Sequence, residues 1–403
     1  MSAFADLPDD FVNWLKENPS HLHVDEDELV SGFSTREQYG QYLAHLWEKA
    51  INHKSEHIHI TTYDDDAYDM VEDGDCFDIY LKQHPVLTAD FVVLATGNVQ
   101  PRLPSGIPAS FGKSEYYFGN PWKKDCIENL DPTKDVLIIG NGLTMADTVL
   151  GLSENGFAKN IYTVSPHGFN LNPWKETIPP YSGANIPEML NGKVVLSELV
   201  KSLNRHRKIA FNQQQSFYNV IDSLRPHASQ IWQSINWEEK QQFLKYLRHL
   251  WGSIRHRLPA KMHAFIGDMY TQNRLFTYKG RVVELIEFDG VVNVTLNCEG
   301  VLKHLAVQRI INCTGPEGSL KLSANDLLKN LDKKGIICQD ALNMGINAHA
   351  EDGRAITHGG QCRHNLFVIG TNLKGILWES TAVPELRVQA QKLAWHLLKK
   401  YQS

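Results

Sequence analysis

Two glycines, Gly140 and Gly142, lie between an apolar run and a helical pattern, and this stretch is the strongest candidate for a ligand-binding site. The run at residues 136–139 is wholly apolar and rich in β-branched side chains, which indicates a strand buried on both faces of a sheet. Residues 143–154 repeat apolar positions at helical spacing and end at an Asn-Gly stop signal. Bare backbone N–H groups at a helix N-terminus favour an anion, so the pattern predicts a pyrophosphate-binding turn.

The surroundings of this turn are those of a βαβ unit. A second β-branched run follows at residues 161–165, at the distance such a unit requires. Met145 occupies the third glycine position of the G-x-G-x-x-G pattern, although Ala146 beside it is small enough for close helix–strand packing. A tight turn without any ligand is the alternative reading. We predict nucleotide contacts at Gly140, Gly142, Leu143 and Thr144.

Composition limits the classes of function. The chain has 403 residues, a formal net charge of −6 and a pI near 6.3, which disfavours a nucleic acid or an anionic membrane as partner. Its six cysteines are scattered without a C-x-x-C pair or metal-ligand spacing, which argues against a dithiol redox enzyme or a metal site and indicates a reducing, cytoplasmic setting. No apolar run approaches the ~20 residues of a membrane span. The oligomeric state and the catalytic residues stay open.

The remaining patterns place strands and helices on both sides of the glycine turn. Helices are predicted near residues 8–18 and 34–47, the second with a capping box at Ser34 and Glu37. An antiparallel meander with an Asp-Gly hairpin is predicted at residues 58–94. A buried strand at residues 91–98 ends in Ala95-Thr96-Gly97, and another at 309–315 ends in Cys313-Thr314-Gly315. Two strands at 281–288 and 291–297 precede the second of these. A last strand at 366–371 ends in Gly370-Thr371, and a terminal helix begins near Pro384.

This set of two Thr-Gly strand ends around one glycine-turn unit resembles the two-dinucleotide-binding flavoproteins. In that family an NAD(P) domain is inserted into an FAD domain, and the two crossing strands end in Ala-Thr-Gly. Asp147, seven places after Gly140, matches the acidic residue of the nicotinamide motif. The resemblance implies an α/β fold with a Rossmann-like NAD(P) domain at 131–315 inserted into an incomplete FAD-binding domain at 1–130 and 316–403. A basic helical elaboration is expected at 170–269.

More narrowly, the chain is similar to the bacterial FAD/NAD(P)-binding flavoprotein family that includes flavin-dependent urate hydroxylase-like proteins. The matching stretches are Arg36, Tyr39, Gly40, Tyr42 and Leu43; residues 142–145; Leu224 through His227; Arg255 through Arg257; and Gly375, Trp378, Glu379, Pro384, Glu385 and Arg387. The resemblance implies an FAD-dependent NAD(P)H oxidoreductase, a monooxygenase or oxidase, that passes hydride from NAD(P)H to flavin and electrons on to oxygen or a small organic acceptor.

The same resemblance supplies the candidate flavin contacts. They are Thr96, Gly97, Thr314, Gly315, Gly370, Thr371, Trp378 and Glu379. For Trp378 the alternative is a core aromatic at a strand-to-helix corner, and for Glu379 a charge that complements a helix dipole.

A flavin domain of this kind begins with its own strand and Gly-x-Gly-x-x-Gly turn, yet no glycine-rich turn precedes Gly97. A truncated gene model or fragment, a loss of flavin binding and a split enzyme are the competing explanations, and each predicts impaired FAD binding by these 403 residues. The alternative function is therefore a non-catalytic nucleotide-binding protein or half of a split flavoprotein. A methyltransferase is disfavoured by the two Thr-Gly strand ends.

The choice of nicotinamide and of substrate rests on fewer residues. The strand at 161–165 continues as Ser165-Pro166-His167, without the acid that would accept from a ribose 2′-hydroxyl, which favours NADPH over NADH through Ser165 and His167. Arg225, His227 and Arg255 are candidates for gripping an anionic small-molecule substrate, and Arg225 and Arg255 are expected to face the flavin site. The alternative is that these residues, together with Arg248, His256 and Arg257, form a solvated basic face.

Overall fold

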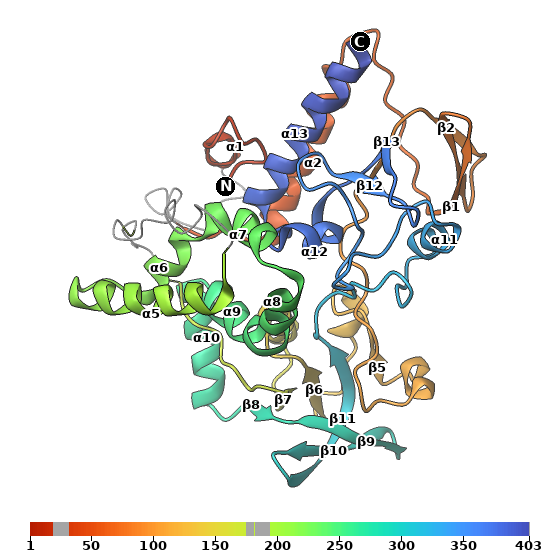
Figure 1. Cartoon of the computed structure of the whole chain (residues 1–403). Helices are drawn as coiled ribbons and strands as arrows, with labels where there is room; N and C mark the ends of the chain where they lie inside the picture. Colours follow the sequence, from red (N-terminus) through yellow and green to blue (C-terminus); the bar gives the residue numbers. More distant parts are fainter. Residues whose placement is uncertain (19–31, 175–180, 182–193, 403) are drawn as a thin grey trace. The chain divides into compact units, whose positions relative to one another are not determined.

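The computed structural model describes residues 1–18, 32–174, 181 and 194–402, and they form two compact units. Unit 1 consists of Met1–Asn98 and Gly318–Ser403, and unit 2 consists of Val99–Glu317, so that unit 2 is an insertion in unit 1 (Figure 1). The chain passes from one unit to the other directly after Thr96-Gly97 and again directly after Thr314-Gly315. Of the predicted domain boundaries, that at 315 lies beside the second crossing and that at 130 lies inside unit 2; the predicted division itself stays a prediction.

Unit 1 is built from short strands and helices of both chain ends. Its elements are α1 (Asp10–Glu17), α2 (Arg36–Asn52), β1 (Ala67–Asp73), β2 (Cys76–Leu81), β3 (Leu87–Ala89), β4 (Val92–Leu94), α11 (Asp326–Lys334), β12 (Arg354–Ile356), β13 (Cys362–Val368), the 3₁₀ turn η7 (Gly370–Leu373), α12 (Lys374–Leu377) and α13 (Val383–Gln402).

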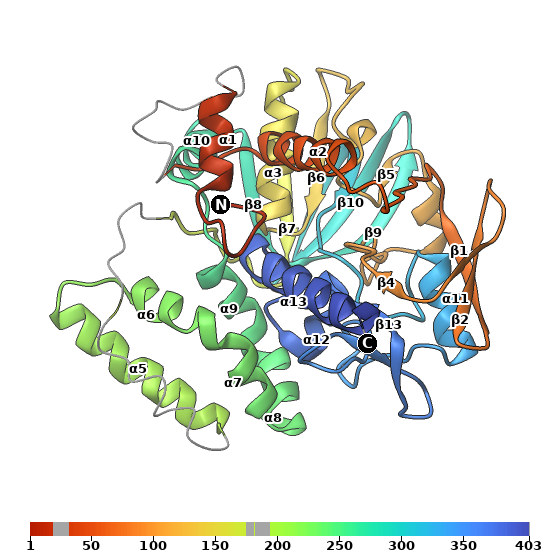
Figure 2. The same cartoon turned by 90° about the horizontal axis from the view of Figure 1, so that it is seen from above.

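Two small sheets organise unit 1. Strands β1, β2 and β3 form the predicted antiparallel meander, with Gly74 at φ +61° in the hairpin between β1 and β2. Strand β13 pairs in parallel with β4 and antiparallel with β12, so the C-terminal strand lies beside the strand that leads to Thr96-Gly97. Helix α13 lies beside α12 (Figure 2), and Gln389 of α13 accepts a hydrogen bond from the Gly370 N–H at 2.9 Å.

The N-terminal helices pack on each other through aromatic side chains. Phe11, Trp14, Leu15 and Tyr42 form a small core between α1 and α2. The capping box of α2 was predicted one residue too early, at Ser34 and Glu37. In the structure the Thr35 side chain accepts from the Gln38 N–H and the Gln38 side chain accepts from the Thr35 N–H.

Unit 2 contains the glycine turn and the helical segment. Its elements are η3 (Ala109–Lys113), β5 (Tyr117–Phe118), η4 (Lys124–Cys126), β6 (Asp135–Ile139), α3 (Leu143–Glu154), β7 (Ile161–Ser165), α5 (Leu196–Asn212), α6 (Phe217–Ser223), η5 (Arg225–His227), α7 (Ala228–Ser234), α8 (Trp237–Gln242), the π-helix η6 (Phe243–Leu247), α9 (Arg248–Arg255), α10 (Ala260–Thr271), β8 (Leu275–Lys279), β9 (Arg281–Phe288), β10 (Val291–Cys298) and β11 (Val301–Asn312).

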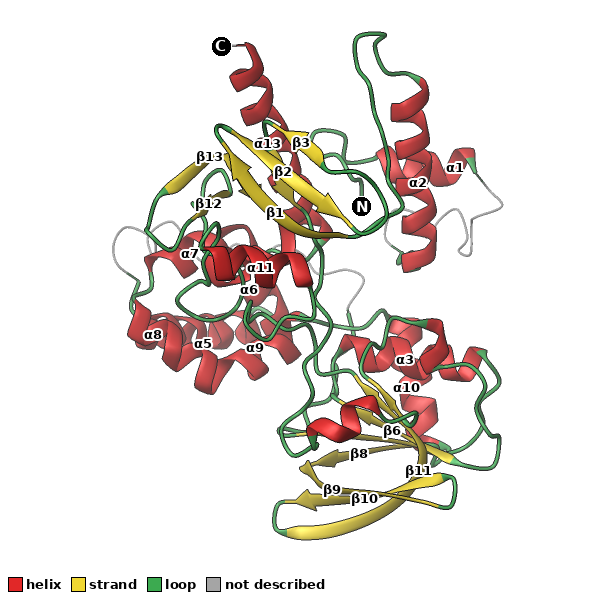
Figure 3. Cartoon of the chain, turned by 90° about the vertical axis from the view of Figure 1, so that its right-hand side faces the viewer, coloured by secondary structure: helices red, strands yellow, loops and turns green. Residues whose placement is uncertain are grey.

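The sheet of unit 2 has the strand order β8-β7-β6-β11-β10-β9, with β5 beside β11. The first four strands are parallel, and β11, β10 and β9 are antiparallel. Val136 and Ile138 point into the core under α3 and α10, whereas Leu137 and Ile139 point into the core on the other face. Strand β6 is therefore buried on both faces, as predicted, and Figure 3 shows α3 and α10 together above the sheet. The parallel strand β8 was not predicted.

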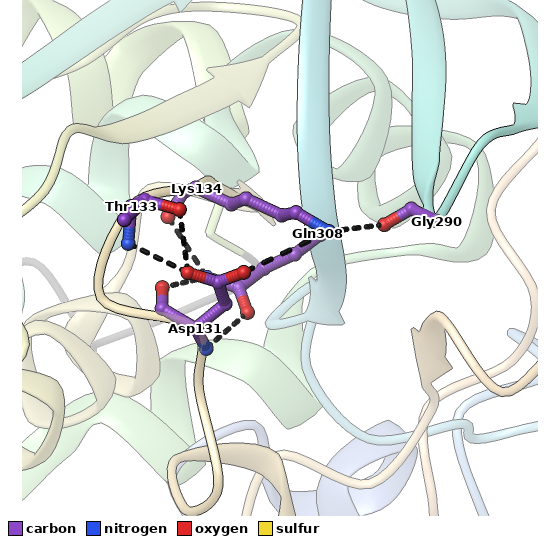
Figure 4. A network of polar contacts seen from close by, with 5 residues as sticks. All are labelled: Asp131, Thr133, Lys134, Gly290 and Gln308. Carbon is purple, nitrogen blue, oxygen red and sulfur yellow. Dashed lines mark hydrogen bonds and ion pairs between the residues drawn. The ribbon is translucent and has the colours of Figure 1, made fainter.

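A polar network fixes the amino end of β6 against β11 (Figure 4). Gln308 of β11 accepts from the Asp131 N–H at 2.7 Å and donates to the carbonyl oxygens of Asp131 and Lys134 at 2.8 Å each. Asp131 also accepts from Thr133 Oγ1 at 2.6 Å, and Lys134 Nζ donates to the Gly290 carbonyl at 3.1 Å. These contacts fix the amino end of β6 against β11, at the edge of the sheet opposite the glycine turn.

Helices α5 to α10 form a helical segment from Leu196 to Thr271. Of the predicted segment at 170–269, residues 175–180 and 182–193 lie outside the described residues. Its core contains Leu224, Ile231 and Ile235, packed against Trp251 of α9. In the described part of the chain, no helix is long and apolar enough to cross a membrane. Across the same residues, no cluster of three or more His, Cys, Asp or Glu side chains is arranged to hold a metal ion.

Candidate functional site

The glycine turn of unit 2 begins where β6 meets the end of β11. Gly140 has φ +117°, and a Cβ atom there would lie 2.3 Å from the Cys313 carbonyl oxygen, so only glycine fits. From β6 the chain runs by α3 to β7 and then to β8, whereas β11 lies on the other side of β6. The turn therefore lies at the topological switch point of the parallel strands, where open α/β sheets bind ligands.

The start of α3 fits an anionic group. Gly142 is its N-cap, and among the described residues no side chain caps the N-terminus and no atom lies within 4 Å of an added Cβ. The N–H groups of Leu143 and Thr144 belong to the first helical turn, where the helix itself supplies no acceptor. Asn141 Oδ1 is buried without a hydrogen-bond partner in the described chain, and the Asn141 amide donates to the Phe169 carbonyl oxygen at 2.6 Å. These residues fit a nucleotide pyrophosphate.

The loop after β7 lies beside this turn. Ser165 Oγ accepts from the Gly168 N–H at 3.1 Å, and the rings of His167 and Phe169 stack at 5.4 Å with an interplanar angle of 11°. His167 also contacts His249, at 4.5 Å between ring centroids. The sequence predicted Ser165 and His167 as nucleotide contacts, and the bond from Asn141 connects their loop to the glycine turn.

The second crossing lies at the same edge of the unit 2 sheet. Thr314 donates from its N–H and its hydroxyl to Asn312 Oδ1, at 3.2 and 2.7 Å, and Gly315 follows with φ +93°. Asn312 is fully buried and its amide donates to the Arg102 carbonyl oxygen at 2.9 Å. Sequence reasoning missed Asn312, whose role depends on residues more than 200 positions away.

In unit 1 the predicted flavin contacts gather at two strand ends. Thr371 Oγ1 donates to the Gly97 carbonyl oxygen at 2.6 Å, and the Asn372 amide donates to Thr96 Oγ1 at 2.7 Å. Gly97 and Gly370 have φ +67° and +82°. These contacts bring the end of β4 to the turn after β13. Asn372, which is buried, was not predicted.

Trp378 and Glu379 follow this turn and are nearly buried, each 9% exposed. Trp378 has φ +63°, a conformation that costs an aromatic residue on the order of 1–3 kcal/mol, and such strain gathers at ligand sites. Next to them the Ser380 hydroxyl is buried without a partner among the described residues. The strained corner and the unpaired hydroxyl fit the ribityl and ring portions of a flavin.

A buried carboxylate supports this corner and was missed by sequence reasoning. Asp340 accepts from the Leu342 and Met344 N–H groups at 2.8 and 2.7 Å, and burial raises its pKa above the ordinary value. A Cβ atom on Gly375 would lie 2.2 Å from Asp340 Oδ1. Gly375, part of the most specific family motif, is therefore required for α12 to pack on this carboxylate.

The predicted substrate residues occupy the helical segment of unit 2. Arg225 and His227 are half-buried in η5, and Arg255 at the end of α9 is 7% exposed. Arg257 pairs with both oxygens of Asp222 at 2.5 Å and lies 4.0 Å above the Trp174 ring, which makes it a structural ion pair. Arg225 and Arg255 belong to unit 2, whereas the turn at Gly370 to Trp378 belongs to unit 1. That these arginines face the flavin site therefore stays a prediction.

Comparison with known proteins agrees with this geometry. Residues 1–99 match the family model described as FAD-NAD(P)-binding, a match that includes Thr96-Gly97. No curated protein sequence matches the chain.

Solved structures resemble nearly the whole chain at low identity. L-lysine 6-monooxygenase from Pseudomonas syringae has a TM-score of 0.64 and 17% identity, over 96% of this chain and 81% of that one. The Kutzneria sp. 744 ornithine N-hydroxylase with reduced FAD, NADP⁺ and L-ornithine has a TM-score of 0.61 and 16% identity, over 98% and 83%. T. acidophilum thioredoxin reductase has a TM-score of 0.50 and 13% identity, over 90% and 81%.

The chain thus has the two-dinucleotide-binding flavoprotein fold, which confirms the predicted fold class. The resemblance to the FAD/NAD(P)-binding family is likewise confirmed, for the stretch that its family model covers.

Proposed function

We propose that this protein is an FAD-dependent NAD(P)H oxidoreductase of the flavin monooxygenase type. The observation that carries the proposal is the insertion of unit 2 between two Thr-Gly strand ends, with a glycine turn at the switch point of its sheet. When bound, the two cofactors supply the redox chemistry, with hydride passing from NAD(P)H to the flavin and electrons going on to oxygen.

The residues of the chain serve to bind and orient. The N–H groups at the start of α3 would hold the pyrophosphate of a nicotinamide nucleotide, and Gly142 would let it approach. In unit 1, Thr96, Gly97 and Thr371 would line the ribityl side of a bound flavin, while Trp378 and Glu379 would lie at its ring. The neighbours with the higher TM-scores hydroxylate ornithine and lysine, which supports a monooxygenase with a small amino-acid-like substrate.

The cysteines argue against a disulfide reductase, the class of the thioredoxin reductase neighbour. All six are free, and the sequence contains no C-x-x-C pair. Burial raises the pKa of Cys313 to about 12 and that of Cys126 to about 11, so both thiols stay protonated at neutral pH and are poor nucleophiles. Free thiols also support the cytoplasmic location that we propose.

The test is NADPH oxidation by the purified chain with FAD added in excess, followed with oxygen consumption. The proposal expects NADPH binding and FAD-dependent oxygen uptake that rises with a substrate from a panel of L-ornithine, L-lysine and small carboxylates. The Gly142→Ala variant is the matched control, because its added methyl group faces the nucleotide rather than the protein. A folded chain that binds neither NADPH nor NADH would overturn the proposal.

A further inference from the structure

A cluster of cationic and imidazole side chains lies at the carboxyl edge of the unit 2 sheet, beside the loop that follows β7. The His249 and His167 rings are 4.5 Å apart, and Arg248 Nη2 donates to His249 Nε2 at 3.2 Å. Arg248 and His249 begin α9, about 80 residues after β7 in the sequence. The helical segment therefore brings the guanidinium group of Arg248 close to the loop after β7, which contains no arginine of its own.

No ion pair with an acidic side chain explains the charge or the position of Arg248 among the described residues. In the part of the chain that the structure describes, no acidic side chain forms an ion pair with Arg248, whereas Arg102 lies close enough to lower its pKa, in addition to burial. Glu317 Oε2 lies 3.7 Å from Arg102 Nε. Two guanidinium groups with one carboxylate leave a positive excess that a bound anion would relieve.

A π-helical turn precedes Arg248 and affects the direction of its side chain. The π-helix at Phe243–Leu247 ends directly before Arg248, and such single π turns change the direction of the side chains that follow and occur often at functional sites. Both Arg248 and His249 reach solvent. Burial and the neighbouring Arg248 and His167 lower the pKa of His249 to about 4, so His249 is neutral at physiological pH and its Nε2 accepts from Arg248.

The position identifies the anion. In a nucleotide-binding βαβ unit the ribose 2′ position lies at the end of the second strand, where an acid accepts from a hydroxyl or an arginine accommodates a phosphate. Here that strand is β7, and it is followed by His167, which contacts His249. The bond from Asn141 to the Phe169 carbonyl holds this loop beside the pyrophosphate turn.

We infer that Arg248, oriented by His249 and placed beside His167, binds the 2′-phosphate of NADPH and makes the protein select NADPH over NADH. The inference rests on the proposed function, because it assigns a residue to the nucleotide that this function requires. Ser165, bound to the Gly168 N–H, belongs to the turn that carries His167 rather than to the guanidinium cluster.

The experiment compares NADPH and NADH binding by fluorescence titration to the full chain and to Arg248→Ala. The inference expects the variant to lose about 10- to 100-fold in NADPH affinity, the range of a charged hydrogen bond, and less than about two-fold in NADH affinity. Arg207→Ala is the matched control, since Arg207 is an exposed arginine on α5. The probe 2′,5′-ADP should bind more tightly than 5′-AMP to the wild type and equally to the variant.

The outcomes separate the two proposals. Equal losses of NADPH and NADH affinity in Arg248→Ala, with unchanged circular dichroism, would place the arginine on the shared pyrophosphate and overturn the inference. A wild-type chain that binds both nucleotides equally well would overturn the inference and leave the proposed function standing. A wild-type chain that binds neither would overturn both.

Discussion

The Thr371 hydroxyl donates a hydrogen bond to the carbonyl oxygen of Gly97 at 2.6 Å. This bond joins the turn after β13 to the Thr96-Gly97 end of β4, although the two residues are 274 positions apart in the sequence. Beside it, Asn372 binds the Thr96 hydroxyl at 2.7 Å. Gly97 is held at φ +67° in this arrangement. The backbone at Thr96-Gly97, the proposed flavin contact of unit 1, is therefore positioned by the turn after β13.

Replacing Thr371 by valine should remove this connection and keep the shape of the side chain. We expect a loss of about 1 kcal/mol in the free energy of unfolding, the usual net value of one such hydrogen bond. Urea unfolding followed by circular dichroism measures it. Thr371→Ser is the control, since it keeps the hydroxyl, and a valine variant as stable as the serine variant would show that the bond contributes nothing.

The two glycines of the turn should respond differently to alanine. Gly140→Ala places a Cβ 2.3 Å from the Cys313 carbonyl at positive φ, so at least about 1–3 kcal/mol of unfolding free energy should be lost. Gly142→Ala meets no described atom within 4 Å and has φ −101°, so stability should stay within about 1 kcal/mol of the wild type.

NADPH titration completes this comparison. Gly142→Ala should lose about ten-fold or more in affinity, because its methyl group occupies the space from which the pyrophosphate approaches. A Gly142→Ala variant that binds NADPH as tightly as the wild type would contradict the assignment of this turn.

Local signals explain why the sequence predicted the turn and the crossings. Gly140 and Gly142 follow four apolar residues, and α3 begins and ends at the predicted residues. Where two local patterns compete, sequence cannot decide: Ser34 with Glu37 and Thr35 with Gln38 both fit a capping box, and the structure uses the second pair.

Features that depend on tertiary contacts were not predictable. Strand β8 is five residues long and lacks a clear alternation, so it is defined by its pairing with β7. Arg248 sits in an ordinary amphipathic stretch, and only the π turn before it and the contact between His249 and His167 place it at the end of β7. Asp340 and Asn372 are single polar residues whose partners are distant or backbone groups.

The imidazole of His249 should make stability depend on pH. Its folded-state pKa of about 4 lies below the ordinary 6.5, because burial, Arg248 and His167 disfavour the charged form. The contribution to stability is therefore present above pH 6.5 and is lost as the pH falls toward 4, since the unfolded chain binds the proton more tightly. Between pH 7 and 5, His249→Asn should lose less unfolding free energy than the wild type.

Urea unfolding at the two pH values measures this difference, and subtracting the variant from the wild type cancels the other titrating groups. His45→Asn is a suitable control on α2, because His45 belongs to unit 1. If wild type and His249→Asn lose the same free energy between pH 7 and 5, the imidazole is not held neutral by its surroundings.

The flavin content of the 403-residue chain is the last prediction, and it follows from what unit 1 presents. In the proposed site, Thr96, Thr371 and the corner at Trp378 would meet only the ribityl and ring portions, and a second set of free N–H groups at a helix N-terminus would be needed for the FAD pyrophosphate. No glycine-rich turn that could supply them precedes Gly97 in the sequence. Among the described residues, β4 pairs with β13 on one side and with no strand on the other.

The purified chain should therefore hold well under one flavin per polypeptide. The open edge of β4 should promote association, because Val93 in this strand and Phe91 before it are exposed and not buried as the sequence predicted. Absorbance near 450 nm after denaturation measures the flavin, and light scattering measures association. Substituting lysine for the exposed Val93 is a useful variant, since a charge on this edge should reduce association without changing the flavin content. Stoichiometric FAD in the unmodified chain would show that unit 1 binds the pyrophosphate through residues other than a glycine turn, and would remove the reason for expecting weak binding.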